Sequence, residues 1–515
     1  MACIVERKPL SFVDATPQTE ALKNFLAATA AFVAVSQPAF AYHVKRARTT
    51  SLLGSFPGQG ALPTVAQVQS TSSGNDSLPL ENIQGDILVG MKKQKEQFVF
   101  FHINNATTFK KVLKTYAPAN ITSIQTLLSA PSAQPLAFVN LAFSQSGATA
   151  LGVTDDLGDS FFSAGQFADA SALGDDTSNW DSTFTGTDVH GVFLIGSDET
   201  SFVEQYQSDL EAKLGDAWTV SLTIASAARP GDEAGHEHFG YLDGISNPTI
   251  TGFGTALPGQ SVVDPGIILA GRTGDTVSRP SWALDGSFLV FRKLKQLVPE
   301  FNKWTLANAI QNASGNLTAQ EGADLLGSRM FGRWKSGAPI DLSPDVDDAS
   351  LGTDPQRNNN FNYTHAGSDI TSDESRCPFS AHIRKTNPRD LESVIGHANH
   401  AIRAGTPYGP ELTDDESSSG TTSTDRGLAF VEYQSNIGNG FRTQQEVWAN
   451  AAAFPFGKTE SIGLDPVIGQ GDRTTYGLNA QNVTESYSVP SFVISNGGEY
   501  FFSPSITALV ETFAA

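Results

Sequence analysis

Cysteine is scarce in this chain of 515 residues, which has Cys3 and Cys377 as its two thiols. Cys3 lies in a segment that we expect to be removed, so the mature protein would keep one thiol and no intramolecular disulfide. The sequence therefore excludes a disulfide scaffold, and it excludes a zinc or iron–sulfur site built from cysteines alone.

Positive charge is also scarce. The 33 Lys and Arg residues are outnumbered by 54 Asp and Glu residues, which gives a formal net charge of −21. A nucleic-acid partner requires a basic face, so we expect none. Long apolar runs are missing beyond the N-terminal segment, so we expect no membrane partner either.

The N-terminal segment has the pattern of a signal peptide. An apolar run over residues 25–35 is too short to span a bilayer, and Ala39-Phe40-Ala41 after it is a small-x-small cleavage pattern. We expect residues 1–41 to be a signal peptide and the protein to be secreted to the extracellular space. Residues 42–77 are rich in Ser, Gly, Pro and Gln without periodicity, and we interpret them as a pro-segment or disordered arm. Seven Asn-x-Ser/Thr sequons agree with a secreted glycoprotein: Asn75, Asn105, Asn120, Asn312, Asn316, Asn362 and Asn482.

The ordered part of the chain contains a weak internal repeat. A strand pattern over 97–103 leads into a helical pattern over 109–116, and a strand over 287–292 leads into a helix over 298–310. This repeat predicts duplicated α+β domains, which we place at 78–270 and 271–515. Other expected elements are a helix over 201–214, a strand over 218–228, and long loops over 256–285 and 335–380.

Four segments carry residues suited to chemistry. In the first, His382 stands near Arg384, Lys385 and Arg389 in a protein that is otherwise acidic. A short strand-like segment of this kind could offer an imidazole to haem iron and positive charges to the haem propionates. On its own, the segment is better interpreted as a basic surface loop with a core histidine.

In the second segment, Gly240 and Gly244 bracket Asp243 and allow the backbone to turn sharply and approach a flat ligand. An isolated Asp-Gly is usually just a turn. The pair His236 and His238 could suit a zinc hydrolase, but no third ligand follows at a suitable spacing. The pair His397 and His400 has helical spacing and also lacks a companion ligand.

In the third segment, Arg403 precedes a Gly/Pro turn, where an arginine commonly pairs with a surface carboxylate. The fourth segment, residues 427–435, has the pattern of a buried strand, and its simplest interpretation is core.

Taken together and in this order, the segments resemble the dye-decolorising peroxidase family, and its fungal secreted branch in particular. Residues 240–244 match the family's Gly-x-x-Asp-Gly motif, His382 its proximal histidine, Arg403 its distal arginine, and 427–431 its Gly-Leu-x-Phe-Val strand. Further matching stretches are Asn82–Leu88, Gly332–Pro339, Leu464–Gln470 and Gly497–Phe502. The resemblance implies an α+β fold of two ferredoxin-like domains with antiparallel sheets and peripheral helices, as in the dimeric α/β-barrel superfamily.

The resemblance also implies one haem b per chain, held mostly by the second domain. His382 would bind the iron through Nε2, and its other ring nitrogen would donate to Asp465 or to a backbone carbonyl. Asp243 would move protons on hydrogen peroxide, and Arg403 would stabilise the negative charge that develops.

Other positions receive roles by the same resemblance. Leu428 and Phe430 would narrow the distal pocket, and Arg384 would bind a propionate, with Arg333 and His365 as further candidates. Bulky dyes of the anthraquinone type, phenols and lignin-related donors would be oxidised through surface electron transfer at Tyr408, with Trp448 as a second relay.

Downstream of Tyr408 lies an acidic cluster that could bind Mn²⁺ as a substrate, or could simply be solvated: Glu411, Asp414, Asp415 and Glu416. Two other classes of function stay open, a haem carrier without turnover and an acidic binding module without a cofactor. We expect a monomer or a homodimer.

Overall fold

The computed structural model describes residues 48–71, 77–471 and 473–515. The expected signal peptide, residues 1–41, lies outside the described residues. Residues Ala47–Ala515 belong to one compact unit. Within the described ranges, every helix is too short or too polar to cross a membrane.

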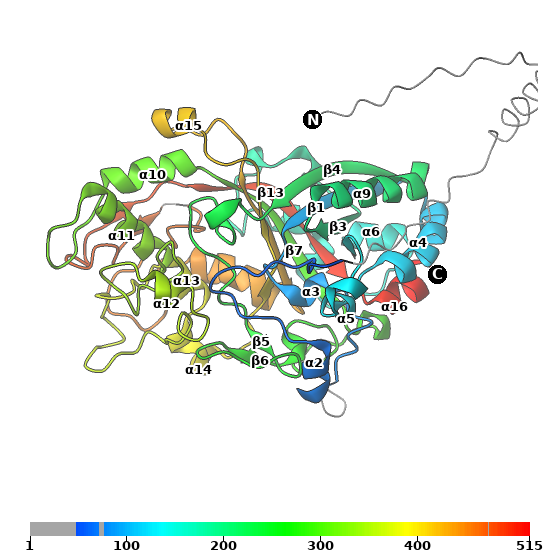
Figure 1. Cartoon of the computed structure of the whole chain (residues 1–515), viewed down its shortest axis with the longest axis horizontal. Helices are drawn as coiled ribbons and strands as arrows, with labels where there is room; N and C mark the ends of the chain where they lie inside the picture. The colour runs from blue at the N-terminus through cyan, green and yellow to red at the C-terminus, as the bar shows by residue number, and fades with distance from the viewer. Residues whose placement is uncertain (1–47, 72–76, 472) are drawn as a thin grey trace, which may run out of the picture. The chain divides into compact units, whose positions relative to one another are not determined.

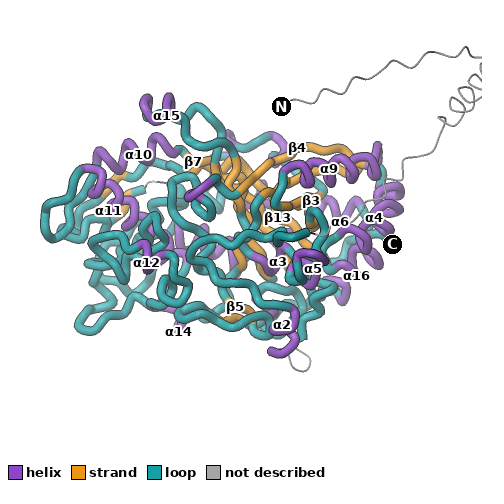
Figure 2. The backbone as a smooth tube through the Cα atoms, in the orientation of Figure 1, coloured by secondary structure: helices purple, strands orange, loops and turns teal. Residues whose placement is uncertain are grey.

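Helices and strands follow one another along the whole unit (Figures 1 and 2). The strands are β1 Lys95–Ile103, β2 Phe138–Phe143, β3 Gly191–Ser197, β4 Trp218–Ala227, β5 Thr249–Ile250, β6 Val262–Val263, β7 Ser287–Gln296, β8 Ile402–Arg403, β9 Thr406–Tyr408, β10 Gly427–Gln434, β11 Thr474–Thr475, β12 Tyr487–Ser488 and β13 Val493–Ser503. The α-helices are α2 Val65–Thr71, α3 Asp86–Val89, α4 Ala106–Asn120, α5 Ile124–Leu127, α6 Gln145–Ala150, α7 Ser160–Ala164, α8 Gln166–Asp169, α9 Thr200–Leu214, α10 Val298–Ala307, α11 Ala319–Phe331, α12 Ala349–Gly352, α13 His382–Thr386, α14 Glu392–Ile395, α15 Asp414–Ser419 and α16 Ile506–Ala508.

The first half has a ferredoxin-like arrangement. Its chain order is β1-α4-β2-β3-α9-β4, and its sheet order is β2-β3-β1-β4 with antiparallel neighbours. Alternate residues of β1 serve two cores, because successive side chains of a strand point to opposite faces. Phe98 and Phe100 pack with Phe291 of β7, whereas Val99 and Phe101 join the cluster of Phe109 in α4.

The second half completes the same sheet. β7 pairs with β13 on one side and with β10 on the other, and β9 joins β10 to β4 of the first half. Because β13 also reaches β2, the strands close into a barrel whose interior is filled by apolar side chains from both halves. In Figure 1, α4 and α9 lie beside the first-half strands, and α10 and α11 lie at the opposite end.

The predicted elements can be compared with those of the structure. The strands expected over 97–103, 218–228 and 287–292 correspond to β1, β4 and β7, and the helices expected over 109–116, 201–214 and 298–310 correspond to α4, α9 and α10. The domain boundary at residue 270 stays a prediction.

The expectation of a disordered arm over 42–77 needs correction for residues 48–71. Leu52 and Val68 in this stretch are fully buried in the barrel-side core. Composition alone missed this packing because a few apolar anchors suffice to dock a polar segment. Whether the stretch is a pro-segment stays a prediction.

Candidate active site

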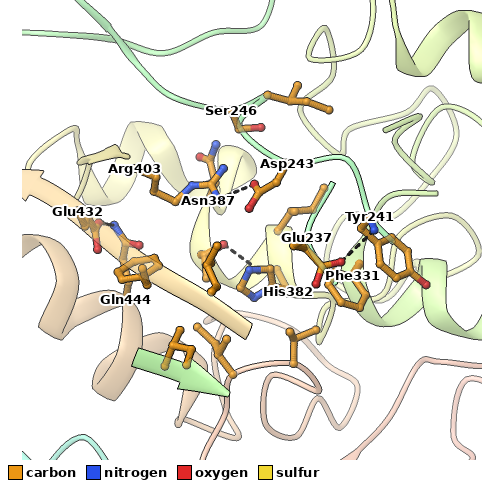
Figure 3. Close-up of a pocket in the computed structure, with 18 of the residues that line it drawn as sticks. Glu237, Tyr241, Asp243, Ser246, Phe331, His382, Asn387, Arg403, Glu432 and Gln444 are labelled. Atoms are coloured by element: carbon orange, nitrogen blue, oxygen red, sulfur yellow. Dashed lines mark hydrogen bonds and ion pairs between the residues drawn. The ribbon is translucent and has the colours of Figure 1, made fainter. Parts of the chain in front are cut away.

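A cavity lies on the outer face of β10, outside the barrel interior. Leu428, Phe430 and Glu432 line it, whereas the alternate residues of the same strand, such as Ala429 and Val431, point into the barrel core. The other walls come from the 237–248 loop, β7, α11, α13 and the turn before β8. Figure 3 shows His382, Asp243 and Arg403 facing this space together.

His382 is the first residue of α13, not part of a strand, so the expected strand-like segment is wrong. Its Nδ1 lies 2.9 Å from Asp465 Oδ2, the contact that the sequence analysis expects. Asp465 is fully buried and its other oxygen accepts backbone N–H groups of Val467 and Ile468. Burial raises the pKa of the Asp465 carboxyl, but His382 and these N–H donors lower it more, and the net shift is downward. The lowered pKa keeps the Asp465 carboxylate ionised. Because Asp465 contacts Nδ1 of His382, Nε2 is left for another partner.

Asp243 and Arg403 form an ion pair at the opposite side of the cavity. Arg403 Nη1 lies 2.6 Å from Asp243 Oδ1, and the backbone N–H of Gly244 donates to the same oxygen. Burial raises the pKa of Asp243, but Arg403 outweighs it, so the pKa falls below its ordinary value. Asn247 holds the arginine in place by bonding to both its backbone N–H and its carbonyl. The pair thus offers a carboxylate and a fixed cation side by side.

Glu237 shapes the loop that carries Asp243. Its carboxylate accepts the backbone N–H groups of Phe239 and Tyr241, on either side of Gly240, whose φ is 93°. Such a positive φ favours glycine. Burial raises the pKa of Glu237 to about 7. The sequence analysis did not select Glu237, although its place three residues before Gly240 was visible.

Two arginines, the buried Arg333 and the half-buried Arg389, line the cavity without an ion-pair partner among the described residues. Arg333 donates to the carbonyls of Gly337 and Asn358, and Arg389 donates to neutral oxygens that include the carbonyl of Asn359. Burial, together with the nearby Arg389, lowers the pKa of Arg333 to about 9. Burying a positive charge without a partner costs free energy, so an anionic group bound at this wall would stabilise the site. With an imidazole and apolar walls, this donor set fits a haem and its propionates.

Arg384 and His365 do not line the cavity, which corrects two of the three propionate predictions. Because α13 is a helix, His382 and Thr386 share a face toward the cavity while Arg384 points away. Arg384 is buried against the rings of Phe379 and Tyr363. His365 Nε2 lies 2.9 Å from Asp341 Oδ1 instead. Arg389, which was noted only as a nearby cation, lines the cavity instead.

Leu428 and Phe430 both line the cavity, as expected from the sequence. Glu432 continues the same face of β10 and was missed, although strand alternation places it there. It lies opposite Arg403 in the pairing of β10 with β8, and Gln444 donates to it at 3.1 Å. Burial raises its pKa to about 7.

Tyr408 and Trp448 are not surface side chains, which corrects the expectation of exposed aromatics. Tyr408 is 5% exposed and donates its hydroxyl to Asp425 at 3.0 Å. Trp448 is 4% exposed and stacks on Phe454, with ring centroids 5.1 Å apart. Phe454 in turn contacts Phe456, which is 56% exposed, so an aromatic series connects Trp448 with the surface.

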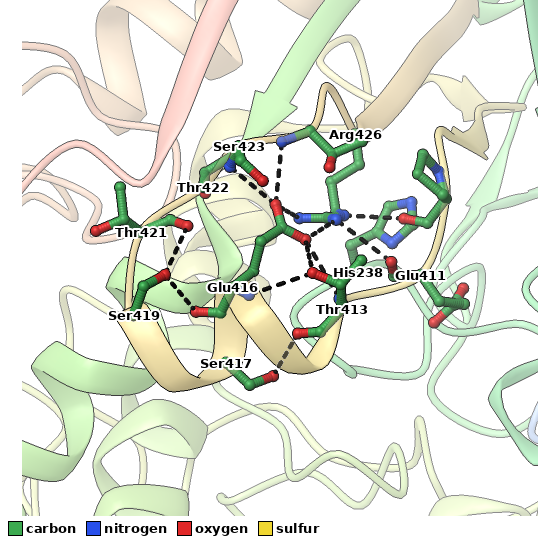
Figure 4. A network of polar contacts seen from close by, with 12 residues as sticks. His238, Glu411, Thr413, Glu416, Ser417, Ser419, Thr421, Thr422, Ser423 and Arg426 are labelled. Carbon is green, nitrogen blue, oxygen red and sulfur yellow. Dashed lines mark hydrogen bonds and ion pairs between the residues drawn. The ribbon is translucent and has the colours of Figure 1, made fainter.

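Two of the four carboxylates in the acidic cluster proposed for manganese form ion pairs with arginines. Glu411 binds Arg229. Buried Glu416 binds Arg426 and forms a capping box with Thr413 at the start of α15 (Figure 4). These carboxylates are neutralised by guanidinium groups and so are poor ligands for a cation.

The other two acids, Asp414 and Asp415, are exposed in the first turn of α15. Over the described part of the chain, no group of three or more metal-binding side chains comes together. Oxidation of Mn²⁺ at this cluster stays a prediction. Of the histidines weighed as zinc ligands, His238 contacts the carbonyl of Tyr408 through Nε2, and His397 and His400 both contact Glu392.

The comparisons with known proteins agree with this geometry. A family model described as the DyP dimeric alpha+beta barrel domain matches residues 82–230. Dye-decolorizing peroxidase AauDyP1 of Auricularia auricula-judae is 52% identical over 473 residues, which cover 90% of this chain and 91% of that protein. Peroxidase 2 of Mycetinis scorodonius is 52% identical over 490 residues, which cover 92% and 94%.

Solved structures extend the similarity to three dimensions. A crystal structure of DyP has a TM-score of 0.84 and 70% identity, and covers 85% of this chain and 99% of its own. A dye-decolorizing peroxidase in complex with 2,6-dimethoxyphenol has a TM-score of 0.83 and 62% identity, and covers 85% and 100%. With about half of its residues identical to those of fungal peroxidases over nine-tenths of its length, this chain belongs to the dye-decolorising peroxidase family.

Proposed function

We propose that this peroxidase is a secreted haem enzyme that uses hydrogen peroxide to oxidise bulky dyes and phenolic or lignin-related compounds. The observation that carries the proposal is the arrangement of one cavity. An Asp243–Arg403 ion pair lies on one side of it, and His382, with Nε2 unengaged by Asp465, lies on the other.

In this proposal His382 ligates the iron, and Arg333 and Arg389 hold the propionates. Bound haem would supply the redox centre that takes up the oxidising equivalents of peroxide. Asp465 accepts a hydrogen bond from the proton-bearing Nδ1 of His382, and this bond keeps the ring oriented and electron-rich.

Asp243 acts on the protons of peroxide. A carboxylate can take a proton from one peroxide oxygen and deliver it to the other, and such acid–base help contributes roughly 10²–10⁴-fold to a rate. Arg403 holds positive charge beside the oxygen on which negative charge grows. Leu428 and Phe430 form an apolar wall that admits peroxide and excludes bulky donors.

Bulky donors therefore need a route for electrons through the protein. The relative solved with 2,6-dimethoxyphenol supports a phenolic donor class for this chain. We propose Tyr408 and Trp448 as buried relays, with Phe454 and Phe456 lying between Trp448 and solvent.

The test compares absorbance spectra and peroxide-dependent oxidation of an anthraquinone dye and of 2,6-dimethoxyphenol. Wild type should show a Soret band and oxidise both donors. Asp243→Asn should keep the band and lose turnover, His382→Ala should lose the band, and Asp354→Asn at the surface should change neither. A haem carrier without turnover, the alternative function, would give a Soret band and no oxidation in wild type.

Secretion and oligomeric state belong to the same proposal. We expect the active protein in the culture medium of an expressing fungus, with an N-terminus downstream of residue 41. Mass spectrometry of the intact protein, with and without removal of N-glycans, tests the processing and the sequons. Light scattering distinguishes the monomer from the homodimer.

A further inference from the structure

Residues 56–59 form a tight turn that presents two side chains together. Pro57 precedes Gly58, whose φ is 69°, and Gln59 N donates to Phe56 O at 3.4 Å. Proline and then a glycine with positive φ are the central residues of a type II turn. Phe56 and Gln59 therefore emerge on the same side, and Asn358 Nδ2 anchors the turn through the Gly58 carbonyl at 2.8 Å.

This turn sits on the loop that carries Asp243. Gln59 Nε2 donates to the Asp243 carbonyl at 3.0 Å and lies so close to Gly244 that a Cβ there would meet it at 2.2 Å. Phe56 lies against Gly235, where an added Cβ would be 2.9 Å from the phenylalanine Cβ. Gly235 and Gly244 also have positive φ angles of 92° and 76°, which favour glycine, so the turn packs on the loop at two glycine positions.

Between the turn and the loop lies a small cavity. Phe56, Gln59, Asp243 and Leu428 all line it. Asp243, Leu428 and Glu237 also line the large cavity, so the two cavities share these residues as a common wall. The small cavity therefore lies between the N-terminal turn and the Asp243 side of the active site.

The solved relatives match the catalytic body of this chain and leave a share of it uncovered that is about the size of its N-terminal segment. The solved relatives align over 99–100% of their own chains but cover only 85% of this one, and the family model begins at residue 82. Residues 1–77 make up about the share that is left uncovered. The solved chains therefore match the catalytic body alone, whereas AauDyP1 and Peroxidase 2 match 90% and 92% of this chain and so extend into the N-terminal segment.

We propose that the small cavity is a route for small ligands to Asp243, that Phe56 and Gln59 form a stopper that closes it, and that the segment 48–71 keeps the enzyme latent until it is removed. The proposal rests on the assignment of Asp243 to the peroxide side in the proposed function. The partner that fits the mouth of this route is this chain's own turn. Its removal opens a direct route for small ligands and leaves the catalytic residues in place.

The experiment uses full-length protein with a protease recognition sequence in place of residues 72–76, so that the chain folds before it is cut. Cyanide is the probe, because it is small and a solved relative binds it. We expect cutting and removal of the segment to raise the cyanide association rate at least tenfold. The uncut double variant Phe56→Ala/Gln59→Ala should show a similar rise, and Gln69→Ala on the exposed face of α2 should show none.

A second readout does not depend on haem. A synthetic peptide of residues 48–71 should bind the cut apoprotein in calorimetry, and the same peptide with alanine at 56 and 59 should bind at least tenfold more weakly. Equal cyanide rates before and after cutting, or equal binding of the two peptides, would overturn the stopper. If the segment only assisted folding, refolding yield would change without a change in rate, which also refutes the proposal. Failure of the proposed function would instead appear as a protein without a Soret band.

Discussion

Arg403 Nη1 lies 2.6 Å from Asp243 Oδ1, and the two residues are 160 positions apart in the chain. Asp243 follows β4 in a glycine-rich loop, whereas Arg403 ends β8 beside β10. The closed barrel brings the two segments together, and Asn247 bridges them. The pair fixes the protonation state of the acid, and this relationship leads to the first two predictions.

The reaction with peroxide should persist in acid. The folded-state pKa of Asp243 lies below its ordinary value of about 3.9, so the carboxylate base is present above that range and is lost only as the pH falls through the lowered pKa. Stopped-flow rate constants with peroxide should therefore stay nearly constant from pH ~7 to ~4. Asp243→Asn should lower them by roughly 10²–10⁴-fold. A decline that begins near pH ~6.5, where a histidine titrates, would contradict Asp243 as the base.

Replacing Arg403 should shift the acid limb of this pH profile to higher pH. In Arg403→Leu, burial acts on Asp243 without the opposing cation, so the Asp243 pKa rises. The rate at neutral pH should fall by about 10²–10³-fold because a charge stabiliser is lost. The same pH series on Arg357→Leu, an exposed arginine paired with Asp354, is the control and should match wild type. An unchanged limb in Arg403→Leu would show that the ion pair does not control Asp243.

Loss of the Asp465 charge should weaken haem retention. Asp465→Asn keeps the shape but removes the anion that accepts from His382 Nδ1. Second-layer partners of this kind are worth roughly 10–100-fold in metal affinity. Haem transfer to apomyoglobin measures the effect, and we expect dissociation to accelerate within that range. Retention equal to wild type would assign the orientation of His382 to packing instead.

Loss of Arg389 should destabilise the haem-loaded protein more than the apoprotein. Arg389→Leu removes repulsion from Arg333 but also the hydrogen bonds that Arg389 donates to Gly259 and Asn359, so the apoprotein should lose little stability. The haem-loaded form should become less stable because a propionate loses its cation. Arg384→Leu is the matched comparison and should destabilise both forms, since Arg384 is buried against Phe379 away from the cavity. Thermal unfolding of both forms decides the matter, and a parallel loss in Arg389→Leu would contradict a propionate role.

The Glu416–Arg426 pair should matter for stability rather than for metal binding. Both side chains are buried, and Arg426 with backbone N–H donors lowers the pKa of Glu416. The stabilisation is present above the ordinary glutamate pKa and is lost as the pH falls through the lowered one. Glu416→Gln should cost roughly 3–5 kcal/mol at neutral pH, measured by urea unfolding. Dye oxidation per folded molecule should not change, and Asp414→Asn should alter neither quantity.

The sequence by itself determined which residue types are available for catalysis and where the local helices and strands form. The alternation in β1 and β7, the helical spacing of α4 and α9, and the glycines around Asp243 are local patterns, and local patterns survive without tertiary context. The motif order pointed to His382, Asp243 and Arg403 for the same reason, since residue types and spacings are read directly from the chain.

Only the tertiary structure decided which side chains share a space. The short helix that begins at His382 directs Arg384 away from the cavity, and Arg333 and Arg389 line the cavity instead. Burial of Tyr408 and the ion pairs of Glu411 and Glu416 depend on segments distant in the chain. The physical reason is that direction and burial are set by the partners of a residue, and barrel closure brings those partners from far along the sequence.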